Sequence, residues 1–466
     1  MMDDYTICAP ATQGIGAISV IRVSGAESFP IVEKIFDPAT PGKILSHQDP
    51  NTIHYGSIRD GEKIVDEVLI SLFKAPHSYT GENSIEISCH GSAYIQQRIM
   101  ELLVAHGAQA ARPGEFTQRA FLNGKMDLSQ AEAVADLIAA ESEGAHHVAL
   151  QQLRGGFSDK LKLLRNQLLH FISMIELELD FSEEEVEFAD RKELVRLVKE
   201  ISSLISELIA SFQLGNVLKN GVPVAIIGRP NVGKSTLLNA ILDEERAIVS
   251  DIEGTTRDAI EDTINLEGIN FRFIDTAGIR ETADTIENLG IRKTYQKIDL
   301  ASIVLLLTEA SDDPEIIQKS LLAIRNQMKD GKKNLVVVLN KSDRISESQV
   351  RELEKGIILN ENEQIISISA EQKENVEGLR HLLLDIVNIG SIKHQDVLIS
   401  NIRHYNALKS ASESLTRVSE GLSSTLPSDL LAQDIREALH YLGEITGEVT
   451  TDEILGNIFK NFCIGK

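Results

Sequence analysis

The pattern of apolar and polar residues changes several times along the chain. From 6 to about 119, alternating runs such as DEVLISLFKAP and NSIEISCHGS lie between turn residues, which is typical of strands in an α+β domain. In the second run, Ile85 and Ile87 fall on one side of the predicted strand and Glu86 falls on the other, because side chains alternate across a strand. We therefore expect one covered face and one open face in this sheet.

Beyond Asp127 the period becomes helical, with Ser129 as the candidate N-cap of a helix over QAEAVADLIAAESEG. Apolar residues then recur every three or four positions from Leu150 to Leu179. This stripe predicts one long helix that packs in a helical bundle. A further helix is predicted over KELVRLVKEISSLISELIASF, and the pattern is helical again after His394.

Between Val222 and about Ile386, apolar strands alternate with helices, as in VPVAIIG, ASIVLLLTEA and NLVVVLNKSD. This alternation predicts a mostly parallel sheet with helices on both faces. Helical segments flank the α/β region on both sides, so we expect it to be inserted within one helical domain. The predicted boundaries are 1–119 for an α+β domain, 120–216 and 387–466 for the two parts of an all-α domain, and 217–386 for the inserted α/β domain.

Composition narrows the classes of protein to consider. Lysine and arginine number 46 against 70 acidic residues, which gives a formal net charge of −24 and disfavours non-specific adhesion to nucleic acid or anionic membranes. Cys8, Cys89 and Cys463 lie far apart, so neither a disulfide framework nor a zinc site is predicted. The start MMDDYTICAP has no apolar targeting segment, and no 18 apolar residues run together. We expect a cytoplasmic protein without a membrane span.

The stretch GRPNVGKS, from Gly228 to Ser235, fits the phosphate-binding pattern GxxxxGK[ST] between a predicted strand and a predicted helix. Its glycines allow backbone N–H groups to surround phosphate oxygens at a helix N-terminus. Lys234 is expected to meet the β- and γ-phosphates, and Ser235 to offer its hydroxyl to Mg²⁺. The stretch therefore predicts a P-loop domain of the Ras-like type.

Further motifs follow in the order of a GTPase. DTAG begins at Asp275, where its carboxylate can support the magnesium shell, and NKSD ends at Asp343, whose carboxylate can accept two hydrogen bonds from guanine. The stretch SDIEGTTRD offers Thr256 to Mg²⁺. The set resembles a GTPase of the translation-factor-related class. The predicted GTP-binding residues are Asn231, Val232, Gly233, Lys234, Ser235, Thr236, Ser250, Asp251, Ile252, Glu253, Gly254, Thr255, Thr256, Asp275, Thr276, Ala277, Gly278, Asn340, Lys341, Asp343, Ser369 and Ala370.

One position departs from the Ras-type pattern. Ras-type enzymes have a water-positioning glutamine directly after the glycine of DTAG, whereas this chain has Ile279. An aliphatic side chain cannot orient water, so another residue is expected to do so. No in-line arginine finger is evident either, so another cation is expected to offset the charge of the transition state.

The three-part layout, the PNVGKS loop and the ending FCIGK together resemble the MnmE (TrmE) family of tRNA modification GTPases over essentially the whole chain. The resemblance implies a homodimer that works with the flavoprotein MnmG (GidA) on the wobble uridine of tRNA. The modification would be 5-carboxymethylaminomethyl or aminomethyl uridine. A tetrahydrofolate derivative, 5-formyl or methylene, would supply the one-carbon unit, and FAD would enter only through the partner.

The resemblance also assigns roles that the residues alone would not reveal. It implies a K⁺ ion beside the nucleotide, in the place of an arginine finger, and Glu287 as the catalytic carboxylate that orients the attacking water. The first domain would bind folate and carry the dimer contact. The tail is expected to be anchored on the helical bundle up to Phe462, and Cys463 would be a catalytic thiol delivered by a short arm to which Gly465 gives freedom. The implied ligands of K⁺ are Asn231, Ser250, Ile252 and Thr255, those of Mg²⁺ are Ser235 and Thr256, and those of folate are Arg22, Glu86, Lys125 and Lys466.

A second class of function stays open from the sequence. A regulatory GTPase that assembles or checks a ribosome or another RNA–protein particle would share the nucleotide motifs. Such a switch needs neither a folate pocket nor the thiol of Cys463. The first domain and the tail therefore discriminate between the two hypotheses.

Overall fold

The computed structural model describes residues 5–12, 14, 16–180, 191–242, 262–274, 298–328, 333–387, 398–424, 427–460 and 462–465. The chain divides into two compact units. The first contains 1–139, 149–209 and 402–466, and the second contains 140–148 and 210–401. The second unit is thus inserted in the sequence of the first. Together with the elements below, this confirms the predicted multidomain fold class.

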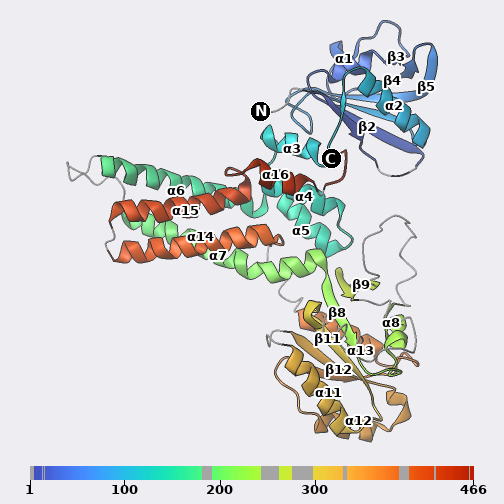
Figure 1. Ribbon diagram of the computed structural model, residues 1–466, viewed down its shortest axis with the longest axis vertical. Coiled ribbons are helices and arrows are strands. Elements are labelled where there is room, and N and C mark those ends of the chain that lie inside the picture. Colours follow the sequence, from blue (N-terminus) through green and yellow to red (C-terminus); the bar gives the residue numbers. More distant parts are fainter. Residues whose placement is uncertain are drawn as a thin grey trace. The chain divides into compact units, whose positions relative to one another are not determined.

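The N-terminal part of the first unit is built on a mixed sheet, seen in Figure 1. Within the described residues this sheet has seven strands in the order β3-β4-β5-β6-β2-β1-β7. Neighbouring strands pair antiparallel, except that β1 and β7 pair parallel. The elements are β1 (Ile7–Pro10), β2 (Ile18–Ser24), α1 (Ser28–Glu33), β3 (Phe36–Pro38), η1 (Leu45–His47), β4 (Ile53–Asp60), β5 (Lys63–Phe73), β6 (Ser84–His90), α2 (Ala93–Ala105) and β7 (Gln109–Ala110).

One face of this sheet is covered and the other is open. Ile85 and Ile87 are fully buried in a core that includes residues of α1 and α2. Glu86 points to the other face, where it lies directly opposite Arg22 of β2 in the antiparallel register. The predicted alternation along β6 is confirmed, and it places these two charged residues side by side.

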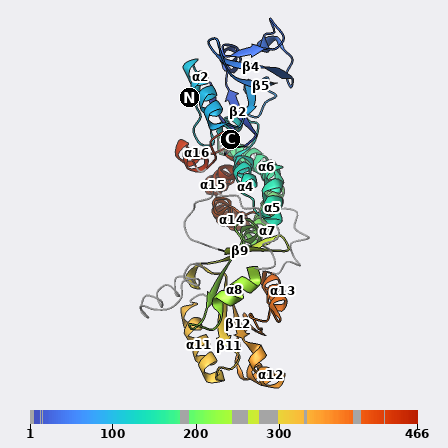
Figure 2. The ribbon, with the colours of Figure 1, turned by 90° about the vertical axis from the view of Figure 1, so that its right-hand side faces the viewer.

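The rest of the first unit is helical. Helix α15 packs against both α6 and α14, which lie beside it in Figures 1 and 2. Their facing positions are apolar, as shown by the buried Leu168 of α6, Leu415 of α14 and Leu439 of α15. The helices are α3 (Glu115–Leu122), α4 (Leu128–Ile138), α5 (Glu143–Leu153), α6 (Gly156–Asp180), α7 (Arg191–Asn220), α14 (Ile402–Ser423), α15 (Ser428–Thr446) and α16 (Asp452–Phe459). The start of α5 and the end of α7 belong to the second unit.

Two local predictions in this region were wrong. The N-cap of α4 is Asp127 rather than Ser129. In this capping box the Asp127 side chain accepts from the Gln130 N–H, and the Gln130 side-chain oxygen accepts from the Asp127 N–H. The stripe from Leu150 to Leu179 spans two helices, because the chain turns at Gly155, whose φ of +90° interrupts the helix. The apolar residues keep the same helical spacing on both sides of this turn, so the sequence pattern did not reveal it.

The length and hydropathy of helix α7 bear on the expectation that the chain has no membrane span. It is the one helix of the described chain that is long and apolar enough to cross a membrane, with a mean hydropathy of 1.3 over its most apolar window. Of that window, 39% is buried in the protein, including Ile201 and Ile205. A core helix of a bundle passes the same test, so this is weak evidence for a span.

The second unit is a Ras-like α/β domain. Its described residues form a six-stranded sheet in the order β13-β12-β11-β8-β10-β9. All neighbouring pairs are parallel except β10 and β9, and the sequence analysis did not foresee β9. The elements are β8 (Val222–Ile227), α8 (Lys234–Leu242), β9 (Asp262–Leu266), β10 (Ile269–Phe273), β11 (Ile303–Glu309), α11 (Pro314–Gln327), β12 (Asn334–Asn340), η3 (Ser342–Arg344), α12 (Glu347–Gly356), β13 (Glu363–Ser367) and α13 (Val376–Val387).

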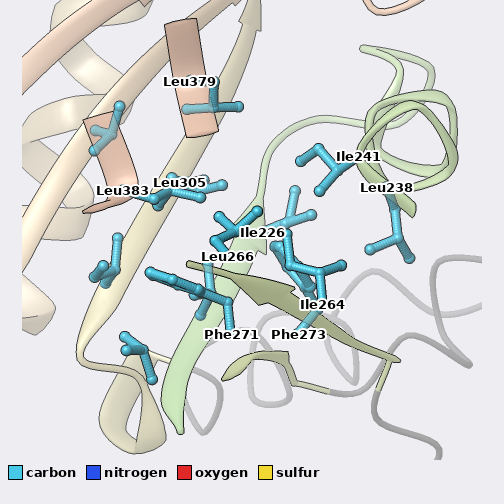
Figure 3. Close-up of a cluster of buried hydrophobic side chains, with 14 of the residues drawn as sticks. Ile226, Leu238, Ile241, Ile264, Leu266, Phe271, Phe273, Leu305, Leu379 and Leu383 are labelled. Carbon is cyan, nitrogen blue, oxygen red and sulfur yellow. The ribbon is translucent and has the colours of Figure 1, made fainter. Parts of the chain in front are cut away.

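Helices cover both faces of this sheet, as predicted. Alternate residues of β11 illustrate the two sides: Leu305 packs in the cluster that contains α8 and α13, and Leu306 packs in the cluster that contains α11. Figure 3 shows the first cluster, to which Phe271 of β10 and Leu238 of α8 both belong. This packing fixes the carboxyl ends of the parallel strands, from which the nucleotide motifs emerge.

Candidate functional site

The predicted phosphate loop connects β8 to α8. It runs from Gly228 to Gly233, and α8 begins at Lys234. A β-carbon at Gly228 would overlap the carbonyl oxygen of Leu307, and one at Gly233 would overlap the side-chain amide of Asn340. Gly233 also has a φ of +97°. Both glycines of the motif are therefore required by close approach of neighbouring groups.

Lys234 lies at the mouth of this loop. Its Nζ donates to the carbonyl oxygens of Gly228 and Arg229 at 2.8 and 2.7 Å. The ammonium group thus lies against the loop that the sequence assigns to phosphate. Helix α8 begins at the same residue, so its first N–H groups add partial positive charge at this point.

Asn340 joins the phosphate loop to the predicted base-binding loops. It is 2% exposed at the end of β12. Its Nδ2 donates to the Val232 carbonyl at 2.8 Å, and its Oδ1 accepts from the Ala370 N–H at 2.9 Å. One side chain therefore satisfies a buried carbonyl and a buried N–H on two separate loops.

Two further contacts complete this network. Lys341, in the left-handed region with φ of +61°, donates from Nζ to the Asn231 carbonyl at 3.0 Å and pairs with Glu309. Ser369 donates from Oγ to Asp343 Oδ1 at 2.6 Å. The structure thus brings together the predicted residues at 231–236, 340–343 and 369–370.

Other predicted GTP-site residues lie outside the described residues. They are Ser250, Asp251, Ile252, Glu253, Gly254, Thr255, Thr256, Asp275, Thr276, Ala277, Gly278 and Glu287. Of the predicted magnesium ligands the structure therefore describes Ser235, and of the predicted potassium ligands it describes Asn231. No group of three or more histidine, cysteine, aspartate or glutamate side chains that could hold a metal ion occurs in the described part of the chain.

The second candidate site is the Arg22–Glu86 pair on the open face of the first sheet. Arg22 donates to Glu86 Oε1 from Nε at 3.0 Å and from Nη2 at 2.8 Å. The guanidinium lies 5.2 Å from the ring centre of Tyr79 and 5.7 Å from that of Phe116. The Glu86 carboxylate remains partly accessible at 28%. A carboxylate, a cation and two aromatic rings thus converge at one place.

Lys125 is exposed, and its Nζ donates to the Pro76 carbonyl at 3.0 Å. Pro76 and Tyr79 belong to one loop between β5 and β6, which connects the two positions through the chain. Lys466 lies outside the described residues.

The C-terminal tail reaches the same ion pair. Phe459 and Phe462 are buried in a cluster with Leu128 of α4, so anchoring of the tail up to Phe462 is confirmed. Arg22 then approaches the Gly465 carbonyl, with Nη1 at 3.4 Å from the oxygen. The sequence analysis gave Gly465 the role of a flexible point, and this was wrong: the residue is buried with φ of +96°.

The three cysteines differ sharply in environment. Burial raises the pKa of the Cys8 thiol to about 12. Burial, and then the charge of Asp66, raise the pKa of Cys89 to about 11. Cys463 is half-buried and exposes part of its side chain. Cys8 and Cys89 are thus held as neutral thiols, and Cys463 is the accessible one.

Sequence reasoning missed Tyr79, Pro10 and Gly114, which surround Arg22 and the tail. Tyr79 is a half-buried aromatic residue in a loop, and burial raises the pKa of its hydroxyl. Pro10 and Gly114 contact the tail through backbone atoms alone. Backbone contacts over such sequence distances leave no periodic signal in the sequence.

Two family models and several named proteins match this chain. The profile described as "MnmE helical domain" matches residues 128–463, and the profile described as "GTP-binding protein TrmE N-terminus" matches residues 6–125. A Bacteroides thetaiotaomicron protein named tRNA modification GTPase MnmE is 55% identical over 468 residues, which covers 100% of both chains. A Flavobacterium psychrophilum protein of the same name is 53% identical over 465 residues and 99% of both chains.

Among solved structures, similarity is local. The crystal structure of Era in complex with MgGDPNP and nucleotides 1506–1542 of 16S ribosomal RNA is 26% identical, and the match covers 41% of this chain and 65% of that chain. Its TM-score is 0.27.

Proposed function

This chain belongs to the MnmE (TrmE) family of tRNA modification GTPases, and we propose that it hydrolyses GTP in the service of tRNA modification. The observation that carries the proposal is identity of 55% to a named relative over the full length of both chains. The linked phosphate and base loops support it independently, because Asn340 bridges them.

Guanine selectivity is assigned to Asp343. A carboxylate accepts two hydrogen bonds from the N–H groups of guanine, whereas adenine presents a mismatched edge. Ser369 donates to one oxygen of this carboxylate at 2.6 Å, which orients the group and leaves further lone pairs for a ligand. Ala370, tied to Asn340, supports the base from the neighbouring loop.

Two ions are part of the proposal. Ser235 presents a hydroxyl at the first turn of α8, which suits Mg²⁺ because hard cations prefer oxygen ligands. Asn231 lies in the phosphate loop with φ of +63°, and its amide oxygen is the described group suited to K⁺. The potassium charge would offset charge on the transferring phosphoryl group, and Glu287 would orient the attacking water.

The Arg22–Glu86 pair is proposed to hold the folate. The residues fit such a ligand: the partly accessible Glu86 carboxylate can accept the adjacent N–H groups of a pterin, and Tyr79 and Phe116 border the guanidinium. Arg22 would orient the Glu86 carboxylate through its two hydrogen bonds, and Lys125 and Lys466 would meet anionic portions. Bound folate would supply the one-carbon unit.

The partners complete the proposal. The protein would act as a cytoplasmic homodimer, with the flavoprotein MnmG (GidA) bringing FAD. Cys463 would serve as nucleophile or acid–base group toward the uracil or the one-carbon carrier. Its partial exposure supports this assignment over Cys8 and Cys89.

A fluorescence titration with 5-formyltetrahydrofolate tests the folate site. We expect saturable binding to the wild type and binding at least tenfold weaker for Glu86→Gln, because hydrogen bonds to a charged group contribute about 1.5–3 kcal/mol. Glu67→Gln is the matched control, since Glu67 is an exposed carboxylate on neighbouring β5 that bonds to Tyr55. Equal affinity of all three proteins would exclude this site.

Mass spectrometry of tRNA nucleosides tests the function as a whole. A deletion strain should lack 5-carboxymethylaminomethyl and aminomethyl uridine, and the wild-type gene should restore them. A regulatory GTPase of ribosome assembly predicts instead normal tRNA nucleosides with altered ribosomal particles. Unchanged wobble uridines in the deletion strain would therefore reject the proposal in favour of that alternative.

A further inference from the structure

The tail residues Phe462, Cys463 and Gly465 each contact the rest of the first unit. The Gly114 N–H approaches the Cys463 carbonyl, with nitrogen and oxygen 3.5 Å apart. Two residues later, Arg22 Nη1 lies 3.4 Å from the Gly465 carbonyl oxygen. Before them, Phe462 is 8% exposed and packs in the cluster with Leu128. Cys463 thus makes the first of two backbone contacts of the tail, and Gly465 makes the second.

Both contact points depend on the absence of a side chain. A β-carbon at Gly465 would overlap the carbonyl oxygen of Pro10 and come within 2.9 Å of its carbonyl carbon. A β-carbon at Gly114 would lie 2.8 Å from the Phe459 carbonyl oxygen and 3.0 Å from the Phe462 Cβ. Both glycines also have positive φ, +96° and +69°, which L side chains rarely adopt.

A third glycine of the C-terminal segment is not crowded in this way. Gly456, within α16, has no heavy atom within 4 Å of an added β-carbon. It lies only nine positions before Gly465 in the same C-terminal segment. The tail therefore contains one glycine that the contact requires and one that it does not.

We propose that Gly465 and Gly114 are positioning residues: their bare backbones let the tail dock on β1 and hold Cys463 at a fixed place beside the Arg22–Glu86 pair. The consequence for catalysis rests on the proposed function, but the docking itself does not. Arg22 connects the docked tail to the proposed folate site, because its guanidinium contacts both the Gly465 carbonyl and Glu86.

The docking is tested by the rate at which iodoacetamide alkylates Cys463 in the full-length protein, followed by peptide mass spectrometry. Gly465→Ala is compared with wild type and with the control Gly456→Ala. A synthetic peptide NFCIGK gives the rate for an undocked tail. The buried Cys8 and Cys89 report in the same spectra whether the first domain remains folded.

We expect Gly465→Ala to weaken docking roughly tenfold or more, from backbone strain alone. The Cys463 rate should therefore rise toward that of the peptide, while Cys8 and Cys89 stay protected. The control should match wild type. Equal Cys463 rates in all three proteins would overturn the docking proposal.

The positioning role is tested by complementation of the deletion strain. Gly465→Ala retains the thiol and should retain GTP hydrolysis, yet it should restore far less modified uridine than Gly456→Ala. Faster alkylation together with normal modification would overturn the positioning role. If Cys463→Ser also restores normal modification, the failure lies in the proposed function of the thiol, and the alkylation result still decides the docking.

Discussion

At the scale of single residues, Asn340 carries more of the nucleotide site than its place in NKSD indicates. Sequence reasoning assigns it to the guanine loop, whereas the structure shows it holding the Val232 carbonyl and the Ala370 N–H together. Nothing in the sequence shows that contact, because Val232 and Asn340 are separated by 108 positions. The NKSD motif could be recognised from the sequence, but the hydrogen bonds that Asn340 makes to the other loops could not.

Replacement of this side chain should weaken both stability and nucleotide binding. Asn340→Ala leaves a buried carbonyl and a buried N–H without their partner, which costs about 1–3 kcal/mol. We expect a lower free energy of unfolding and weaker GDP binding, measured by urea denaturation and isothermal titration calorimetry. Asn334→Ala, half-buried at the opposite end of β12, is the control. A variant that matches wild type in both measurements would contradict the bridging role.

The potassium proposal depends on Asn231. GTP turnover should be much faster in KCl than in NaCl at equal ionic strength, and Asn231→Ala should abolish that preference. Because Asn231 has φ of +63°, alanine would also strain the loop. Asn231→Gly removes the amide without that strain, so it should lose the preference as well. Retained preference in the glycine variant would exclude the amide as a ligand.

At the scale of elements, a buried ion pair joins helices that are distant in sequence. Glu132 of α4 accepts from Arg403 at 2.9 and 2.8 Å and lies 2.7 Å from His404 Nε2, both on α14. Burial would raise the pKa of Glu132, but the charges and hydrogen bonds of His404 and Arg403 outweigh it and hold that pKa at about 2. The pair therefore connects the two halves of the helical domain.

The sign of the pH effect follows from that lowered pKa. The pair stabilises the fold fully above the unfolded pKa of about 4.3, and its contribution is lost as the pH falls toward 2. Glu132→Gln should lower the free energy of unfolding by about 3 kcal/mol at pH 7. The difference from wild type should shrink between pH 4.3 and 2, as followed by urea denaturation.

Glu176→Gln is the control for this experiment. Glu176 pairs with Arg436 between α6 and α15, where both side chains are about half exposed, so its loss should cost below about 1 kcal/mol. If the two variants lose equal stability at pH 7, the buried pair does not have the role inferred here.

The elements themselves were largely readable from the sequence. Three of the foreseen strands of the α/β unit, β8, β11 and β12, have runs of apolar residues, such as NLVVVLN in β12. Strand β9 was missed because the two apolar residues of DTINL are separated by an asparagine and form no run. The turn at Gly155 was missed because the apolar stripe has the same period on both sides of it. The apolar pattern of the sequence thus shows which segments pack in the core. It does not show where a helix is interrupted, as at Gly155.

At the scale of the whole molecule, the two candidate sites belong to separate compact units. The phosphate loop lies in the second unit, and Cys463 lies in the first. We therefore expect Cys463→Ser to abolish wobble-uridine modification while GTP hydrolysis and dimerisation persist. Nucleoside mass spectrometry, phosphate release and size-exclusion chromatography provide the three measurements. Normal modification in the complemented deletion strain would refute a chemical role for the thiol.

The contact between Pro10 and Gly465 has a consequence for the order of biosynthesis. The seven described strands of the first sheet all lie before residue 111, so the ribosome releases that sheet early and it can fold while synthesis continues. The contact between Arg22 and the Gly465 carbonyl can form only after the entire nucleotide-binding unit has been translated. A chain truncated by a late stop codon would keep a folded sheet and a folded GTPase, and would lack the residues that connect Arg22 to the thiol.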